Sequence, residues 1–216
     1  MNSKTIIVAI SFLLCLVSCN NAAHQKQQDG SNPELPILSP KKDGKYQRIA
    51  DFEFKNQYNQ TVTQNTVQGK IYIAEFFFTS CPSICPIVSV QLKEVYTTFK
   101  DEESFLILSH SIDPENDTVK VLQDYYTNTL GIDMPSNWQL LTGEKEKVHD
   151  LANFSYGTVV YEDLDRLKDN IMHSGALLLV DENGLIRGMY DGKDNTHTKR
   201  LIKDVQQLLA ALKEKV

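Results

Sequence analysis

Four runs rich in apolar residues divide the chain. They occupy residues 71–78, 104–112, 137–141 and 175–180. Short runs of this kind, bounded by polar or turn-forming residues, are typical of strands buried in the middle of a sheet. The pattern therefore predicts four central strands.

A helical pattern of apolar residues follows each of the first three predicted strands and occurs again at the C-terminal end of the chain. Helices are predicted at 86–99, 117–126 and 143–153, because apolar residues recur there every three or four positions. The final helix presents an apolar face made by Leu201, Val205, Leu208, Leu209 and Leu212. Strands that alternate with helices predict a parallel-centred sheet wrapped on both faces.

Two hairpins complete the predicted sheet. Residues 49–54 and 61–63 are strand-like and flank a polar turn at 56–60. A second turn, at 182–184, joins the fourth central strand to an antiparallel partner at 185–190. We therefore expect an α/β fold with a central mixed sheet, helices on both faces and an N-terminal β-hairpin.

The N-terminus has the pattern of an export signal. Lys4 supplies a positive charge, and an apolar stretch at 6–17 follows it. Residues 16–19 read Leu-Val-Ser-Cys, which resembles a bacterial lipobox with Cys19 as the site of lipid attachment. Plain secretion with cleavage nearby and an uncleaved anchor are the alternatives, and each still places the folded domain outside the cytoplasm.

These features divide the chain into three parts. We expect a signal peptide at 1–18, a flexible polar tether at 19–45 and a folded domain at 46–216. The formal net charge is −6 and no basic cluster occurs, which argues against nucleic acid or an anionic lipid surface as the main partner.

Cysteine usage points to chemistry. Of the four cysteines, Cys15 leaves with the signal and Cys19 carries lipid, so that only Cys81 and Cys85 remain in the folded domain. A domain of this size builds its own core and does not need a disulfide to fold. A single pair of cysteines close together in an exported protein therefore favours a chemical function over a structural disulfide.

The two cysteines lie where the first central strand runs into a helix. Pro86 suits the first helical turn and Pro82 disfavours the α region at Cys81, so we expect Cys81 in the loop and Cys85 at the helix start. Free N–H groups and the helix dipole favour thiolates there. Two thiolates one turn apart can form a disulfide or hold a soft metal ion. The alternative is a structural disulfide or a pair of buried thiols.

A third ligand would distinguish metal binding from redox chemistry. His173 is the candidate, because it ends an irregular loop directly before the strand at 175–180. One imidazole with two thiolates makes a soft site that suits Cu(I) and also accepts Cu(II). The remaining histidines fall in the tether, in a buried strand, on a solvated helix face and near the start of the last helix; they are His24, His110, His149 and His197.

Four motifs in order resemble the Sco/SenC family. They are FFTSCPSICP at 77–86, SIDPENDT at 111–118, WQLLTG at 138–143 and His-Ser at 173–174. The resemblance covers residues 49–212. It implies a thioredoxin-like fold and copper held by Cys81, Cys85 and His173.

The resemblance also implies a role and a place. The family delivers copper, or reduces thiols, during assembly of the dinuclear copper centre of cytochrome c oxidase. The expected partner is the copper-bearing oxidase subunit or another copper protein, and the expected location is the cell envelope, with the lipid anchor in a membrane and the domain facing the periplasm.

Some positions depart from the family pattern or leave a role open. Many members have an acidic residue before the histidine, where this chain has Met172, and residues 177–179 lack a tyrosine common in the family. Asp113 matches the Asp-Pro position, where it would tune the thiols, contact a partner or simply cap a turn.

The main alternative to a copper chaperone is a thiol-disulfide oxidoreductase. In that reaction Cys81 attacks a partner disulfide and Cys85 resolves the mixed disulfide, without any need for a histidine. A peroxide-reducing relative would need an arginine beside Cys81, which the neighbouring sequence lacks. A tethered binding lipoprotein without chemistry is a further alternative.

Overall fold

A computed structural model describes most of the folded part of the chain. It covers residues 34–133, 135–158, 161–162, 171–172 and 175–215. Residues 34–216 form one compact unit. The predicted signal peptide, Cys19, the first part of the predicted tether and His173 all lie outside the described residues.

A seven-stranded mixed sheet forms the centre of this unit. Its strand order is β11-β10-β5-β6-β7-β3-β4. The bounds are β3 Glu53–Asn56, β4 Thr61–Thr63, β5 Ile71–Phe77, β6 Phe105–Ser111, β7 Trp138–Thr142, β10 Ala176–Val180 and β11 Ile186–Asp191. Strands β5, β6 and β7 are parallel, whereas β10, β11, β3 and β4 pair antiparallel with their neighbours. The predicted mixed sheet and both predicted hairpins are confirmed.

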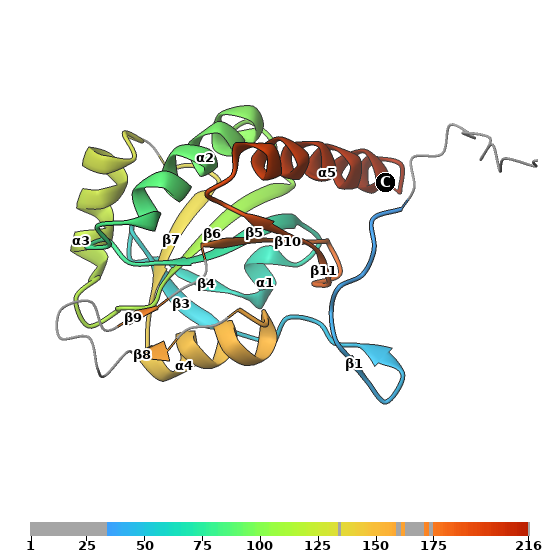
Figure 1. Cartoon of the computed structure of the whole chain (residues 1–216), viewed down its shortest axis with the longest axis horizontal. Coiled ribbons are helices and arrows are strands. Elements are labelled where there is room, and N and C mark those ends of the chain that lie inside the picture. The colour runs from blue at the N-terminus through green and yellow to red at the C-terminus, as the bar shows by residue number, and fades with distance from the viewer. Residues whose placement is uncertain (1–33, 134, 159–160, 163–170, 173–174, 216) are drawn as a thin grey trace, which may run out of the picture. The chain divides into compact units, whose positions relative to one another are not determined.

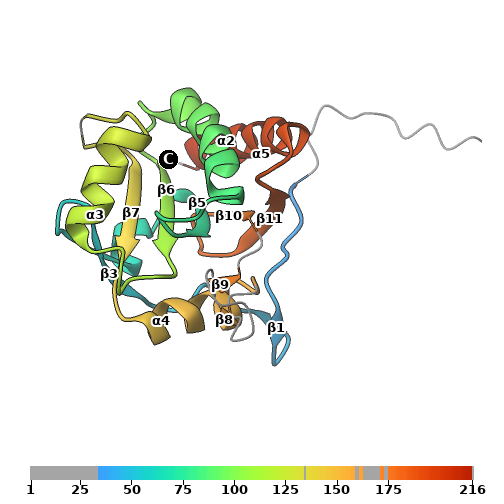
Figure 2. The same ribbon diagram turned by 60° about the vertical axis from the view of Figure 1, so that its left-hand side comes forward.

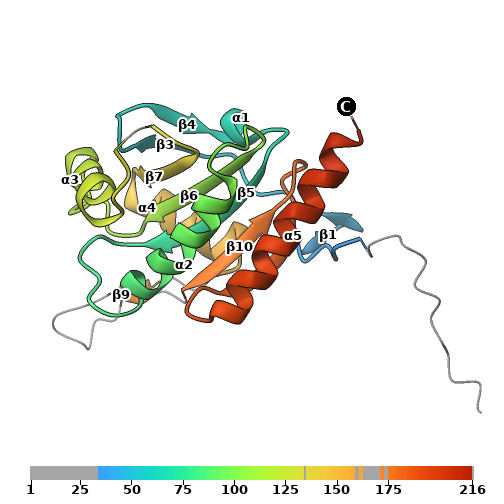
Figure 3. The same cartoon turned by 90° about the horizontal axis from the view of Figure 1, so that it is seen from above.

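Helices cover both faces of the sheet, as Figures 1 and 3 show. On one face lie α2 (Ile84–Phe99) and α5 (Asn195–Lys213), and on the other lies α4 (Lys145–Asp150). α3 (Val119–Asp124) lies beside β7, and the short α1 (Gln64–Val67) follows β4. The side of α2 that faces the sheet is formed by the predicted apolar positions, namely Val88, Leu92, Val95 and Phe99, together with Cys85.

Two helices continue as single π-helical stretches, which the sequence pattern did not predict. η1 (Tyr125–Thr129) extends α3, and η2 (Leu151–Ser155) extends α4. A π turn rotates the following side chains relative to a continuous α-helix. In η1 this places Tyr125 against the cysteine helix, where its hydroxyl lies 3.2 Å from Ser89 Oγ and its ring lies 5.8 Å from that of Phe77.

The two central strands are buried along their whole length. All seven residues of β5 and all seven of β6 are buried, which explains their near-continuous apolar character in the sequence. Two ionisable side chains interrupt this apolar layer, Glu75 in β5 and His110 in β6. Each faces a different layer of the core, and both are described with the site below.

The segment before residue 46 belongs in part to the folded unit. Leu38 N–H donates to the Ile186 carbonyl at 2.7 Å, and Ile186 N–H donates to Ser39 Oγ at 2.8 Å, so this segment covers the β11 edge. Beyond it, β1 (Lys41–Lys42) and β2 (Lys45–Tyr46) form a small hairpin. We assigned residues 34–45 to the tether because they are polar and rich in proline, but backbone groups at an open sheet edge can pair with such a segment.

A second small antiparallel pair lies near α4. It consists of β8 (Tyr161–Glu162) and β9 (Ile171–Met172), which lie within the irregular loop that precedes β10. Among the described residues, no helix is both long and apolar enough to cross a membrane.

Candidate metal centre

Cys81 and Cys85 lie at the carboxyl end of β5, where the chain turns into α2. Cys81 is in the connecting loop, and its N–H donates to the Phe78 carbonyl at 3.2 Å. Cys85 is the second residue of α2, one position after Ile84. Both are thiols rather than halves of a disulfide, and both are buried, with 7% and 3% of the residue exposed. The predicted placement of the pair is confirmed.

The two thiols differ in acidity. Burial opposes ionisation of Cys81, but the backbone N–H groups of Cys85 and Ser83 and the Cys85 thiol donate to its sulfur, so its pKa is lowered. Burial raises the pKa of Cys85, and the neighbouring Cys81 adds to this effect. Our expectation that the helix start favours both thiolates is therefore wrong for Cys85, because the helix N–H groups point at Cys81 and Cys85 is the more deeply buried.

A buried carboxylate ties the cysteine loop to the sheet. Asp117 is 1% exposed and accepts hydrogen bonds from the Thr79 N–H at 3.1 Å, from the Thr79 hydroxyl and from the Ser111 hydroxyl at 2.5 Å. Sequence reasoning missed this residue. Its signal was its place in the SIDPENDT motif, four positions after the Asp113 that we singled out.

Asp113 has a local role. Its carboxylate accepts from the Asn116 side-chain amide at 2.9 and 3.1 Å, and its carbonyl accepts from the N–H groups of Asn116 and Asp117. These are the contacts of a turn residue. Of the roles considered for Asp113, the described contacts support the turn.

A second buried carboxyl group lies on the same side of the sheet as the cysteines. Glu75 accepts a hydrogen bond from the Ser109 hydroxyl, which in turn accepts from Trp138 Nε1 at 2.8 Å. Burial raises the pKa of Glu75 to about 7, and the Ser109 bond offsets this only in part. Sequence reasoning missed Glu75 because it lies inside an otherwise apolar run.

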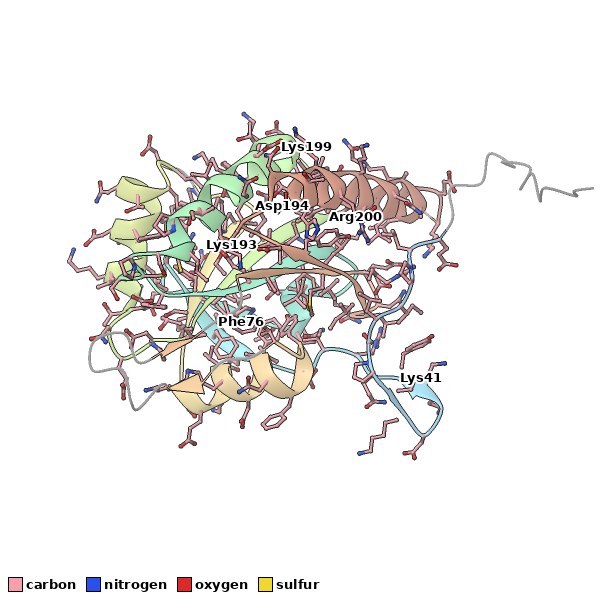
Figure 4. All side chains as sticks on the ribbon, in the orientation of Figure 1. Lys41, Phe76, Lys193, Asp194, Lys199 and Arg200 are labelled. Carbon is pink, nitrogen blue, oxygen red and sulfur yellow. The ribbon has the colours of Figure 1, made fainter. Side chains whose placement is uncertain are left out.

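His110 is a core residue, as predicted. Its ring stacks on Phe76 at 5.1 Å and contacts the edges of Phe52 and Phe54, on the face of the sheet covered by α4. Figure 4 shows Phe76 pointing into that layer. Neither ring nitrogen has a hydrogen-bond partner among the described residues, and burial lowers the pKa of His110 to about 3.

The other described histidines have structural contacts away from the thiols. His149 Nε2 lies 2.9 Å from the Ile112 carbonyl oxygen, and His197 Nδ1 accepts the Asp191 N–H at 2.9 Å. His149 is therefore half-buried and hydrogen-bonded, and not simply solvated as we expected from its helix position.

His173 and its neighbour Ser174 lie outside the described residues. Within the described part of the chain, no three His, Cys, Asp or Glu side chains come together as a metal site. The next residue along the chain, Gly175, is described. A Cβ on Gly175 would lie 3.4 Å from Ile84 Cδ1 and 3.6 Å from Val88 Cγ2, so the start of the β10 segment is placed against the first turn of α2, beside Cys85.

Comparison with known proteins agrees with this architecture. The family model described as SCO1/SenC matches residues 40–210. The chain belongs to the SCO1/SenC family. The SCO1 protein homolog of Bacillus subtilis is 30% identical over 161 residues, which cover 73% of this chain and 81% of that protein.

Solved structures of the family share the fold. The structure of BsSco, described as a member of the Sco family of cytochrome c oxidase assembly proteins with a disulfide switch, superimposes with a TM-score of 0.65 at 26% identity and covers 81% of this chain and 96% of that one. Bradyrhizobium japonicum ScoI with copper bound gives a TM-score of 0.62 at 21% identity, covering 75% and 99%. The predicted thioredoxin-like α/β fold is confirmed.

Proposed function

We propose that this protein is a membrane-tethered copper chaperone. In this proposal Cys81, Cys85 and His173 bind copper, and the chain delivers it to the copper centre of a respiratory oxidase. The observation that carries the proposal is a hydrogen-bonded pair of thiols at the carboxyl end of β5, with Gly175, two residues after His173, lying near Ile84 and Val88 of the cysteine helix.

The thiol pair fits a soft metal ion. Two sulfurs come from one loop and the adjoining helix turn, and the N–H groups of Ser83 and Cys85 stabilise a thiolate at Cys81. Thiolates and imidazole are the donors that Cu(I) prefers, and Cu(II) also accepts this set. Binding displaces the thiol protons, chiefly from Cys85, whose pKa is raised, so affinity should fall with acidity.

Chain geometry supports His173 as the third donor. Two peptide units join His173 to Gly175, and they limit the separation of the two Cα atoms to about 7 Å. A Cβ placed on Gly175 would lie within 3.6 Å of Ile84 and Val88, which are the neighbours of Cys85 one position before and three positions after it on α2. This short connection supports His173 as the third donor, whereas His110 and His197 have other surroundings.

Family membership and the N-terminal pattern support the remainder of the proposal. BsSco is described as belonging to a family of cytochrome c oxidase assembly proteins, and ScoI of Bradyrhizobium japonicum has copper bound. The lipobox-like residues 16–19 support a lipid at Cys19, and with it an anchor in a membrane of the cell envelope with the domain facing the periplasm. Transfer then proceeds by exchange of these donors for those of the partner.

Copper binding by the full chain in detergent under reducing conditions tests this proposal. We expect one copper ion per chain in competition with a Cu(I) chelator and, once the reductant has been removed under anaerobic conditions, a thiolate-to-Cu(II) absorption band with Cu(II). Replacing both Cys81 and Cys85 by alanine should abolish both signals, and copper retained by this variant would contradict the assignment of the two thiols as ligands.

The His173→Ala variant separates the chaperone from the oxidoreductase. We expect its Cu(I) affinity to fall at least tenfold, because one of three donors is lost. The matched control is His197→Ala, which removes a histidine bonded to Asp191 and should bind copper like the wild type. Copper retention unchanged in His173→Ala would contradict the proposed ligand set and leave thiol-disulfide exchange as the function of the pair.

A further inference from the structure

The Asp117 side chain attaches the loop that carries Cys81 to the neighbouring central strand. The Asp117 carboxylate receives three donors, and two of them come from Thr79, two residues before Cys81. The third donor is the hydroxyl of Ser111 at the end of β6. One carboxylate therefore joins the cysteine loop, the neighbouring central strand and the start of α3.

Asp117 is buried and is held by these donors. Only 1% of the residue is exposed, and its described partners are N–H and O–H groups with no cation among them. Its own N–H donates to the Asp113 carbonyl at 2.8 Å, and Thr118 after it caps α3 through the Val121 N–H. The backbone around Asp117 is therefore held by its own hydrogen bonds, independently of the bonds that the carboxylate makes to the cysteine loop.

The geometry of this attachment sets where Cys81 can lie. Thr79 is fixed by Asp117, and Cys81 N–H is fixed by the Phe78 carbonyl at 3.2 Å. Cys85, by contrast, is carried by α2, whose apolar face is anchored independently in the core. The Cys81 sulfur accepts hydrogen bonds from the N–H groups of Ser83 and Cys85, and the loop that carries it is held from the other side by Asp117, so both sets of bonds set the position of one sulfur relative to the other.

We infer that Asp117 is a positioning residue, which holds the Cys81 sulfur where it and Cys85 can bind one copper ion. The inference rests on the proposed function, because it gives Asp117 its role in that site. It acts through Thr79 and does not touch the metal. Replacing a group that orients metal ligands without touching the metal typically changes metal affinity about 10- to 100-fold.

The Asp117→Asn variant tests this inference in the full chain. An amide offers one acceptor oxygen where the carboxylate offers two, and its NH₂ group faces other donors, so at least one bond to the loop is lost. We expect Cu(I) affinity to fall about 10- to 100-fold. The thiolate-to-Cu(II) absorption band should also shift, which a loss of stability alone would not cause.

Matched variants keep the test independent of folding. Asp113→Asn alters a neighbouring carboxyl group that bonds Asn116 and not the loop, so its copper affinity should stay within threefold of wild type. Thr79→Val removes the hydroxyl donor and keeps the backbone bond, so it should weaken binding in the same direction as Asp117→Asn but less. Thr79→Ser keeps the donor and should restore wild-type affinity.

Two results would overturn the inference. The first is a folded Asp117→Asn protein whose copper affinity and spectrum match those of Asp113→Asn. The second is Thr79→Val and Thr79→Ser with equal affinity. The first result would mean that the loop keeps Cys81 in place without the Asp117 carboxylate, and the second that the Thr79 hydroxyl bond, through which Asp117 is proposed to act, does not position the sulfur.

A thiol measurement distinguishes failure of this inference from failure of the proposed function. If the wild type does not hold copper, the chaperone proposal fails, and the same variants are then equilibrated with glutathione. In that reaction the two thiols are oxidised to the Cys81–Cys85 disulfide while glutathione disulfide is reduced to two thiols. Asp117→Asn should shift this equilibrium at least threefold relative to Asp113→Asn, and no shift would refute the positioning role.

Discussion

Replacing His110 by phenylalanine should make the protein more stable, and increasingly so as the pH falls. The imidazole is fully buried among Phe52, Phe54 and Phe76, and its two nitrogens have no hydrogen-bond partner among the described residues. A buried polar atom without a partner costs about 1–3 kcal/mol. A phenylalanine ring of similar shape removes that cost and keeps the aromatic contacts.

The pH dependence follows from the pKa of His110. Burial lowers it to about 3 in the folded protein, against 6.5 as its ordinary value. Between these two pH values the unfolded chain binds a proton that the folded protein does not, so stability is lost as the pH falls from 6.5 toward 3. The full difference corresponds to about 5 kcal/mol, of which about 2 kcal/mol is lost by pH 5.

Urea unfolding of the wild type and of His110→Phe at pH 7.5 and pH 5.0 measures this effect. At pH 7.5 the variant should be more stable by about 1–3 kcal/mol, and at pH 5.0 this advantage should grow by about 2 kcal/mol. All other titrating groups are common to both proteins and cancel in the difference. A difference that does not change with pH, or a variant less stable at both pH values, would refute the reasoning.

Two further predictions concern buried charges. The pKa of Glu75 is raised to about 7 from 4.5, so its contribution to stability is full below pH 4.5 and is lost as the pH rises through 7. In urea unfolding, Glu75→Gln should therefore gain up to about 3 kcal/mol of stability relative to wild type between pH 5 and pH 8. A difference in stability that stays the same between these pH values would contradict this prediction. Arg187 Nη1 lies 2.9 Å from Asp181 Oδ2, with both side chains buried, and Arg187 also donates to the carbonyls of Leu35 and Pro36. Arg187→Met should lower the free energy of unfolding by about 3 kcal/mol, because it leaves the Asp181 carboxylate buried without its ion-pair partner. It should also speed proteolysis before residue 40. Equal stability and equal cleavage would show that this N-terminal segment is held by other contacts.

The fold could be predicted because its strands and helices have strong local patterns. The apolar run at β5 and the helical period of α2 each fix one element, and the turn at 182–184 makes β10 and β11 an antiparallel pair, although the register shift between Leu179 and Val180 was not predicted. The π-helical turns η1 and η2 could not be predicted, since each is a single five-residue stretch, too short for its change of period to show in the apolar pattern of the helix it extends.

The site could be predicted only in part, for a related physical reason. Cys81 and Cys85 are close in sequence, and the strand-to-helix junction places them without reference to the rest of the chain. The role of Asp117 depends on the ends of β5 and β6 meeting at one edge, which only the folded sheet brings about. The raised pKa of Cys85 depends on burial, which the helix-dipole argument did not include.

The most direct test of the account is the set of atoms bound to copper. X-ray absorption spectroscopy of the copper-loaded full chain should show two sulfur donors and one nitrogen donor, and His173→Ala should lose the nitrogen donor while keeping both sulfurs. A metal shell without sulfur, or a nitrogen signal unchanged in His173→Ala, would contradict the assignment of Cys81, Cys85 and His173 to a single ion.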